Sequence, residues 1–292
     1  MHLSVTMYSF NNWARKGKID VKGFIEYCGT LEGVEAVDLL SYYWTDEEKE
    51  RSMVKKWLTD NGLKIAAYAI GNNFAHKGGE KFEKEIKAAK KGIDVAAELG
   101  APCIRIFGGS IETKTDSRSH DPSWGVFGSS LSEDETKEEA VGICIDAVAK
   151  LIDYAKEKDV ILAVENHGGI PATIVECERF REKIKSPYLQ FTLDSGGFLT
   201  AGEDPVKAFS ILADSAAHVH LRDVKKAPEG SRQPYENCVL GEGIVDFLGC
   251  IAKLKEAGYD GYYSIECESE KEKGDLRENV RKSVEYIRSL GL

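Results

Sequence analysis

Four strand-like segments of this chain each carry a side chain that can bind a metal ion, and their regular recurrence constrains the fold more than any other feature. The segments read ILAVE, LQFTLD, HVHLR and YYSIE, and near their carboxyl ends they carry Glu165, Asp194, His220 and Glu266. These residues follow one another at intervals of 29, 26 and 46 residues, which leaves room for a helix and its loops between parallel strands. The sequence therefore predicts repeated strand–helix units.

Apolar and polar side chains alternate in all four segments. Because successive side chains of a strand point to opposite faces, the four candidate ligands share one face and the apolar residues share the other. The ligand face also carries Gln190, Thr192, His218 and Ser264. If helices cover the apolar face, the four ligands point into a common interior.

Strand and helix patterns alternate along the whole chain of 292 residues. Strands are predicted at 3–8, 33–40, 63–70, 103–107, 161–165, 189–194, 218–222 and 262–266. Helices are predicted near 20–30, 46–60, 80–99, 134–158, 173–184, 205–213, 244–257 and 271–289. We therefore expect an α/β fold, a single-domain (β/α)8 TIM barrel over residues 1–292, with its active site at the carboxyl ends of the strands.

Composition restricts the partners and the location of the protein. The formal net charge of −10 opposes binding to phosphate-dense nucleic acid. The seven cysteines are odd in number and form no CxxC pair, which favours reduced thiols in the cytoplasm over a disulfide framework. No segment reads as a leader or a membrane span. We expect a cytoplasmic protein with a small-molecule carbohydrate substrate, no nucleic-acid or membrane partner, and a homo-oligomer as an open possibility.

Two glutamates, one aspartate and one imidazole form an oxygen-rich donor set that suits Mn²⁺ first, with Mg²⁺, Co²⁺ and Zn²⁺ as further candidates. Four protein ligands leave two octahedral positions for neighbouring oxygens of a substrate, where the metal would polarise a carbonyl and stabilise an enediolate. Glu165 and Glu266 are the expected proton-transfer groups, and His167 is a further catalytic candidate on the same strand face. His218 is interpreted as a barrel-core histidine rather than a fifth ligand.

Four other residues are candidates for substrate binding. Arg105 and Arg222 share the strand face of the ligands, and contacts to substrate hydroxyl or carboxylate groups are favoured for them over structural ion pairs. Asp38 stands at the end of the second strand, where it either contacts substrate or caps a helix. Trp124 lies in the long polar segment 108–133 after the fourth strand, which we expect to cover the metal site.

Several motifs resemble those of a known family. The segments ENHG from Glu165, LDSG from Leu193, HVHLRD from His218, GEGIVDF from Gly241 and SIE from Ser264 resemble the successive signatures of the xylose isomerase-like barrels, the sugar phosphate isomerase/epimerase group. The resemblance extends over the whole chain and is strongest in its second half. It implies that one divalent metal ion is bound by the matching residues Glu165, Asp194, His220 and Glu266, and that the two glutamates exchange the proton next to a sugar carbonyl.

The chain departs from this pattern at two positions. Gly197 stands where ketose epimerases have His three residues after the aspartate ligand, and Pro171 stands where they have Glu six residues after the first glutamate. These differences weigh against a plain ketose 3-epimerase. The related DNA-repair endonucleases with three zinc ions need the same His and further histidines after strands two and three, so a trinuclear phosphodiesterase centre is excluded.

Three functions follow as hypotheses. The first is a metal-dependent isomerase or epimerase acting on a sugar, keto-sugar or polyol. The second is a lyase with the same metal site, such as an inosose-type dehydratase or a keto-glycoside cleaving enzyme, in which His167 protonates the leaving group. The third is a non-catalytic sugar-binding subunit. Product analysis separates the first two, and exchange of substrate protons with D₂O separates both from the third.

Overall fold

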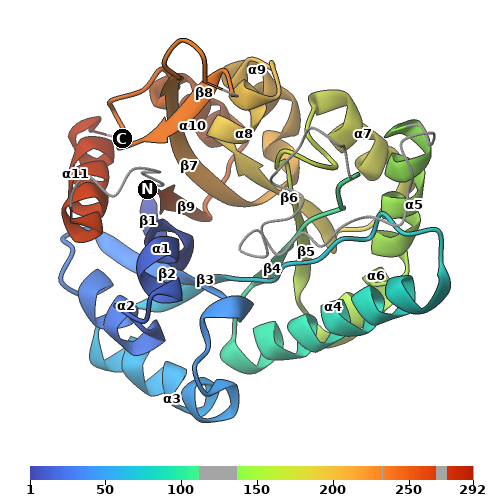
Figure 1. Ribbon diagram of the computed structural model, residues 1–292, viewed down its shortest axis with the longest axis horizontal. Coiled ribbons are helices and arrows are strands. Elements are labelled where there is room, and N and C mark those ends of the chain that lie inside the picture. The colour runs from blue at the N-terminus through green and yellow to red at the C-terminus, as the bar shows by residue number, and fades with distance from the viewer. Residues whose placement is uncertain (112–136, 232, 268–274, 292) are drawn as a thin grey trace.

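Eight parallel strands close into a barrel with helices around it (Figure 1). The computed structural model describes residues 1–111, 137–231, 233–267 and 275–291. Each strand pairs with the next in chain order, and the last parallel strand pairs with the first, so the barrel is closed. The strands are β1 (His2–Thr6), β2 (Val34–Leu40), β3 (Lys64–Ala69), β4 (Cys103–Ile106), β5 (Ile161–Glu165), β6 (Leu189–Asp194), β7 (Ala216–Lys226) and β9 (Tyr262–Glu266). The predicted single TIM barrel is confirmed.

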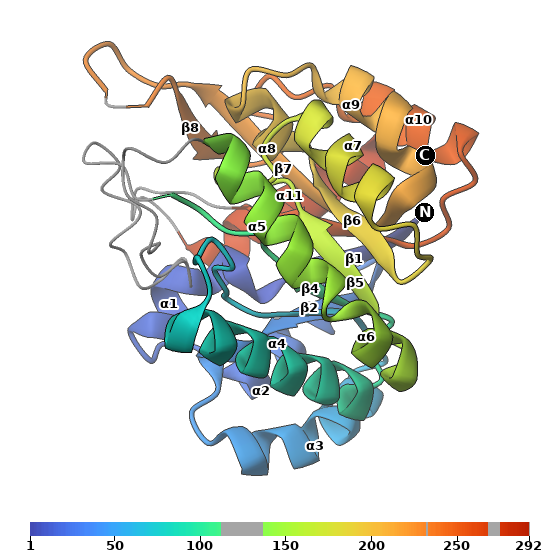
Figure 2. The same ribbon diagram turned by 90° about the vertical axis from the view of Figure 1, so that its right-hand side faces the viewer.

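Helices connect successive strands and pack on the outside of the barrel (Figure 2). They are α1 (Asn11–Arg15), α2 (Val21–Cys28), α3 (Glu47–Asp60), α4 (Gly79–Leu99), α5 (Lys137–Ala149), α6 (Ile152–Lys158), α7 (Ile174–Lys183), α8 (Ser195–Thr200), α9 (Pro205–Leu212), α10 (Phe247–Glu256) and α11 (Leu276–Ser289). Within the described residues, no helix is long and apolar enough to cross a membrane.

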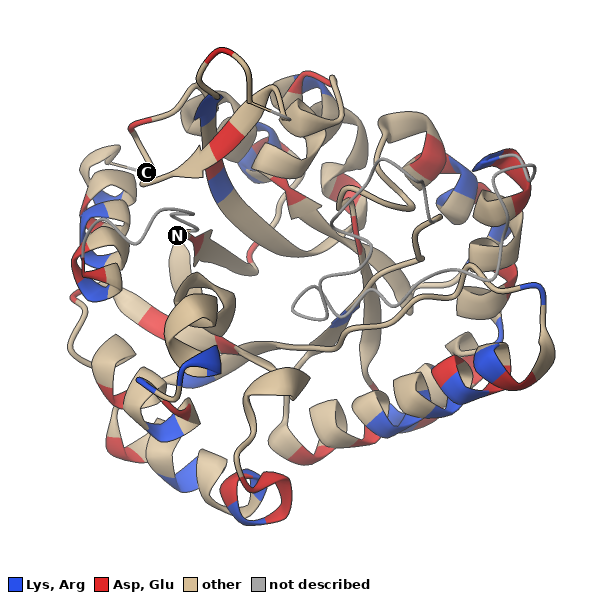
Figure 3. Ribbon diagram, viewed as in Figure 1, with Lys and Arg blue, Asp and Glu red and all other residues tan. Residues whose placement is uncertain are grey.

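The longest helix, α4, shows why the sequence forms this outer layer. Phe82, Ile86, Ala89 and Ile93 recur at helical spacing and are buried, whereas Lys and Glu occupy the exposed positions (Figure 3). The helix ends at Gly100, which has φ 80° and forms a left-handed cap that L side chains rarely adopt. Burial of the apolar stripe against β3 and β4 fixes the helix on the barrel wall.

Several elements differ from the sequence prediction. The single helix predicted over 134–158 is wrong in its middle, because α5 ends at Ala149 and α6 begins at Ile152. β7 continues to Lys226 and pairs antiparallel with an additional strand, β8 (Tyr235–Cys238). The sequence also gave no signal for the short helices α1 and α8. The remaining predicted strands and helices agree with the structure to within a few residues.

A buried carboxylate anchors the loop that follows β8. Asp223 accepts hydrogen bonds from the backbone amides of Val224, Gly241, Gly243 and Val245, at 2.9 to 3.1 Å. A β-carbon at Gly243 would overlap the Asp223 carboxylate, so this position excludes any side chain. The motifs HLRD and GEGIV thus belong to one structural unit, which supports the carboxyl end of β7.

Candidate active site

Three of the four predicted metal ligands meet inside the barrel. Glu165 ends β5, His220 lies in β7 and Glu266 ends β9. The Nδ1 atom of His220 lies 2.7 Å from Oε1 of Glu165 and 2.9 Å from Oε2 of Glu266. One potential donor atom from each residue lies within 4.8 Å of the others, and all three side chains are buried. Two carboxylates and an imidazole facing one point form a donor set that fits a divalent cation.

Asp194 is buried beside this group but holds other partners. Its Oδ2 atom accepts a hydrogen bond from Nε of Arg222 at 2.8 Å and lies 2.7 Å from Nη2 of the same guanidinium. Its Oδ1 atom accepts the backbone amide of Gly197 at 2.9 Å and so caps α8. Among the described residues, the compact set of donor atoms contains Glu165, His220 and Glu266 without Asp194. A fourth ligand at Asp194 stays a prediction.

The crowding of charges shifts the pKa values of the site in opposite directions. Burial opposes ionisation of Glu165, but His220 and Arg105 outweigh it and hold the pKa of Glu165 below its usual range. Burial also opposes protonation of His220, but Glu165 and Glu266 outweigh it and raise the pKa of His220 well above normal. Burial, with Glu266 and Glu165 nearby, raises the pKa of Asp194 to about 6 despite Arg222. The carboxylates therefore gain from a positive charge placed between them.

A cavity opens beside the two glutamates. It is lined by Thr6, Tyr8, Tyr42, Arg105, Phe107, Glu165, His167 and Glu266. The aromatic rings offer apolar faces, while the glutamates and His167 offer proton-transfer groups. Two of the three predicted catalytic residues are in the candidate metal group, and the third lines the same cavity.

Arg105 and His167 are both fixed within this cavity. Nε of Arg105 lies 3.2 Å from Oε2 of Glu165, and Nη1 donates to the backbone oxygen of Ile70 at 2.9 Å. The guanidinium also stacks 4.2 Å from the ring centre of Phe107. The imidazole of His167 packs against that ring from 5.1 Å, and burial lowers the pKa of His167 to about 4. Arg105 thus combines a structural ion pair with a place on the cavity wall.

Two other predicted substrate contacts, Arg222 and Asp38, bind groups of the protein itself. Arg222 binds Asp194 and donates from Nη1 to Oδ1 of Asn237 at 3.0 Å. Asp38 points into the barrel, where its Oδ2 atom accepts hydrogen bonds from His218 and Ser264. His218 is buried in this contact, as expected of a barrel-core histidine. Trp124 and most of the segment 108–133 lie outside the described residues.

Side chains that clamp neighbouring strands together were not anticipated from the sequence. Asn166 accepts the amide of Asp194 at 2.7 Å and donates to its carbonyl at 2.9 Å, so it binds the end of β5 to the end of β6. Asn72 makes the same pair of bonds with Phe107, at 3.0 and 2.6 Å. Ser195 donates to the carbonyl of Arg222 at 2.9 Å and accepts its amide at 3.1 Å. The signal for these clamps is a polar residue just past a strand end.

The Asn166 clamp gives a physical reason for glycine at position 197. A β-carbon there would overlap the backbone oxygen of Asn166 and lie 2.8 Å from its side-chain nitrogen. The amide of Gly197 meanwhile donates to Asp194. The His that ketose epimerases carry at this position therefore has no room while the clamp and the cap are in place.

Comparison with known proteins assigns the family. Residues 28–290 match the family model of the xylose isomerase-like TIM barrel. The chain belongs to this family. Membership in the family shows the scaffold, and the reaction has to be argued from the site itself.

Three proteins show the extent of the similarity. An inosose dehydratase of Geobacillus thermodenitrificans (strain NG80-2) is 26% identical over 254 residues, which cover 82% of this chain and 81% of the relative. The IOLI protein with a bound zinc atom has a TM-score of 0.77 at 18% identity, covering 99% of this chain and 98% of its own. A D-psicose 3-epimerase studied in the presence of D-fructose has a TM-score of 0.73 at 15% identity, covering 99% of each chain. At these identities the two solved structures support the fold alone.

Proposed function

We propose that this xylose isomerase-like barrel is a metal-dependent lyase that removes water from a small keto polyol of the inosose type. The observation that carries the proposal is the convergence of Glu165, His220 and Glu266 on one point beside a cavity that both glutamates and His167 line. The similarity to inosose dehydratases over most of the chain favours loss of water over a change of stereochemistry.

A divalent cation would be held by Glu165, His220 and Glu266. When bound, it would polarise the substrate carbonyl and so acidify the adjacent C–H bond. The donor set admits Mn²⁺, Mg²⁺, Co²⁺ and Zn²⁺, and Mn²⁺ remains our first expectation because two of the three donors are carboxylates. Asp194 would support the site from the side, held by Arg222 and the first turn of α8.

The two glutamates would carry the proton removed from carbon. Each has one oxygen at His220 and a second oxygen near a guanidinium: Oε2 of Glu165 lies 3.2 Å from Arg105, and Oε1 of Glu266 lies 3.6 Å from Arg222. Glu266 therefore has the less constrained second oxygen and is our choice for the base. Removal of this proton and departure of a hydroxyl group from the next carbon leave a carbon–carbon double bond and one molecule of water.

His167 would handle the departing oxygen. It lies at the end of β5, two residues beyond Glu165, and lines the same cavity as both glutamates. An imidazole in this place can hydrogen-bond the leaving hydroxyl group and pass it a proton taken up elsewhere in the site. Phe107 holds the ring by a tilted contact.

Incubation of the metal-loaded protein with inososes and with ketohexoses tests this function. We expect a product lighter than an inosose by one water, formed with exchange of the substrate proton in D₂O. An epimer of unchanged mass would overturn the lyase and support the epimerase that the resemblance implied. Substrate binding without any proton exchange would instead support a sugar-binding subunit.

A further inference from the structure

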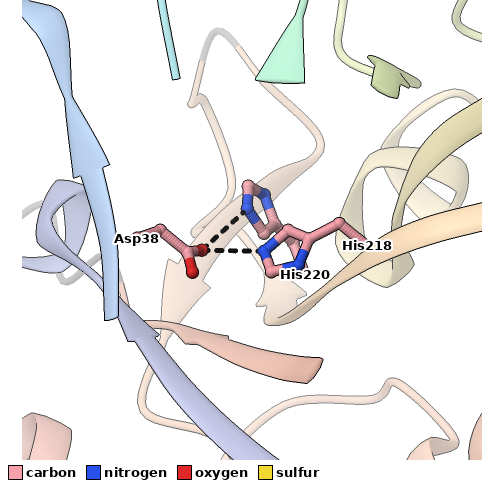
Figure 4. A group of neighbouring side chains, drawn as sticks. All are labelled: Asp38, His218 and His220. Carbon is pink, nitrogen blue, oxygen red and sulfur yellow. Dashed lines mark hydrogen bonds and ion pairs between the residues drawn. The ribbon is translucent and has the colours of Figure 1, made fainter. Parts of the chain in front are cut away.

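A hydrogen-bonded group below the candidate metal site links three strands across the barrel interior. Oδ2 of Asp38, in β2, accepts a hydrogen bond from Oγ of Ser264 in β9 at 2.6 Å. The same oxygen lies 2.8 Å from Nε2 of His218 in β7. It also lies 3.5 Å from Nε2 of His220, one pleat further along β7 (Figure 4). All four side chains are buried.

The two ring nitrogens of His220 face opposite partners. Nδ1 points toward Glu165 and Glu266, and Nε2 points toward Asp38. A histidine binds a metal ion through a nitrogen without a proton, so the other nitrogen must carry the proton. A carboxylate beside Nε2 favours the proton there and leaves the lone pair of Nδ1 for the cation.

We propose that Asp38 is a positioning residue that fixes the tautomer and orientation of His220 for metal binding, with His218 and Ser264 holding Asp38 in place. This inference rests on the proposed metal site and adds to it a role for a residue first expected to touch substrate or to cap a helix.

The surroundings of Asp38 leave its carboxylate little freedom. Ser264 and His218 bind it from β9 and β7, which are separated from β2 by one and two intervening strands. The rings of His218 and His220 meet edge to face at 5.2 Å and 84°, so the two imidazoles support one another. Oδ1 of Asp38 accepts no hydrogen bond from the described part of the chain. Oδ2 is therefore the atom of Asp38 that orients the imidazole ring of His220.

Graded substitutions separate charge from hydrogen bonding. Asp38→Asn keeps an acceptor oxygen and removes the negative charge, Asp38→Ala removes both, and Ser264→Ala removes one support of the carboxylate. Loss of an outer partner of a metal-binding histidine lowers metal affinity by about 10- to 100-fold. We expect about a tenfold loss for Asp38→Asn, a loss nearer 100-fold for Asp38→Ala, and the smallest loss for Ser264→Ala, measured by competition with a chelating dye for Mn²⁺ and Zn²⁺.

The matched control is Glu50→Gln in α3. Glu50 is also a buried carboxylate, but it accepts hydrogen bonds from the amide and the hydroxyl of Thr45, both at 2.8 Å, outside the barrel. This variant should lower the melting temperature without changing metal affinity. If it weakens metal binding as much as Asp38→Asn, the loss reflects general destabilisation and the positioning role is excluded.

Nitrogen NMR of ¹⁵N-histidine protein loaded with Zn²⁺ gives a readout independent of activity. The chain has six histidines, and the signal of His220 is assigned by its loss in His220→Gln. We expect a protected, downfield Nε2 proton on His220 in the unaltered protein, and a weaker, faster-exchanging one in Asp38→Asn.

Three outcomes are decisive. If the unaltered protein binds no divalent cation, the proposed metal function fails. If it binds one cation per chain and the Asp38 variants match it in affinity and in the His220 signal, the positioning role fails while the metal function stands. If it binds two cations and loses one in the Asp38 variants, Asp38 is a ligand of a second ion, and the positioning role is again excluded.

Discussion

His220 is the residue on which the proposed site depends, because its Nδ1 atom is the point where two carboxylates from different strands meet. Glu165→Gln and Glu266→Gln each replace a carboxylate by a neutral amide, and His220→Gln removes the imidazole, so we expect each to lower metal affinity by more than about 100-fold, beyond the loss typical of outer partners. Asp194→Asn should cost about 10- to 100-fold, as an outer partner does. Elemental analysis and dye competition measure both. An equal loss in all four variants would restore the predicted four-ligand site.

His167 offers a second test at this scale, because it lines the cavity without belonging to the compact donor group. His167→Asn should retain the metal and lower kcat by about 10²- to 10⁴-fold, the range expected for loss of a proton-transfer group. Parallel measurement of metal content and turnover separates these effects. Full turnover in this variant would leave His167 with a packing role against Phe107.

The alternation of side chains along each strand predicted which residues face the barrel interior, and the structure agrees for Glu165, His220 and Glu266. It did not predict the partners of Asp194, since Arg222 approaches from the next strand and Gly197 from a short helix with no sequence signal. Side-chain alternation specifies a face of one strand. Which guanidinium reaches which carboxylate depends on distances between strands, which only the closed barrel sets.

At the scale of elements, strand ends are joined by side chains where backbone pairing stops, and the Asn166 clamp is the clearest case. Gly197→Ala places a β-carbon against the Asn166 carbonyl, so we expect a loss of about 1–3 kcal/mol in the free energy of unfolding. Metal affinity should fall with it, because the clamp holds Glu165 beside Asp194. Urea unfolding and dye competition measure the two effects.

Gly142→Ala is the control for that substitution. Gly142 lies in α5 with open space around its position, so alanine should leave metal affinity unchanged and raise stability by about 0.5–1 kcal/mol through helix propensity. If both alanine variants behave alike, the clamp does not constrain position 197.

The long helices α3, α4 and α11 were predicted well, whereas the α5–α6 break and the short elements α1, α8 and β8 were not. α3, α4 and α11 each carry an apolar stripe over 14 or more residues, which helical spacing reveals directly. The break between α5 and α6 falls in a stretch, VAKLID, without Gly or Pro, so no local signal marks it. β8 has four residues and is defined by its pairing with β7, a contact that sequence alternation alone does not specify.

The whole molecule places all seven cysteines in its interior, each as a free thiol. Burial raises the pKa of Cys103 to about 12, and burial with nearby Asp223 raises the pKa of Cys238 to about 12, so both remain thiols at pH 8. Because the thiolate is the reactive form, the folded protein should react slowly with a disulfide reagent at that pH. All seven thiols should react once denaturant unfolds the chain.

Metal binding should slow this reaction further, because a ligand that binds only the folded state lowers the population of the unfolded state. At a free metal concentration about 100 times the dissociation constant, stability rises by about 2.7 kcal/mol, and thiol labelling that proceeds through global unfolding should slow about 100-fold. Labelling rates with Mn²⁺ and after chelation, across low urea concentrations, measure this coupling. His220→Gln should label at the metal-free rate under both conditions. Equal labelling rates for the unaltered protein with and without metal would have one of two causes: labelling occurs through local opening, or no cation stabilises the barrel. Competition with the chelating dye distinguishes the two, because it measures metal binding directly.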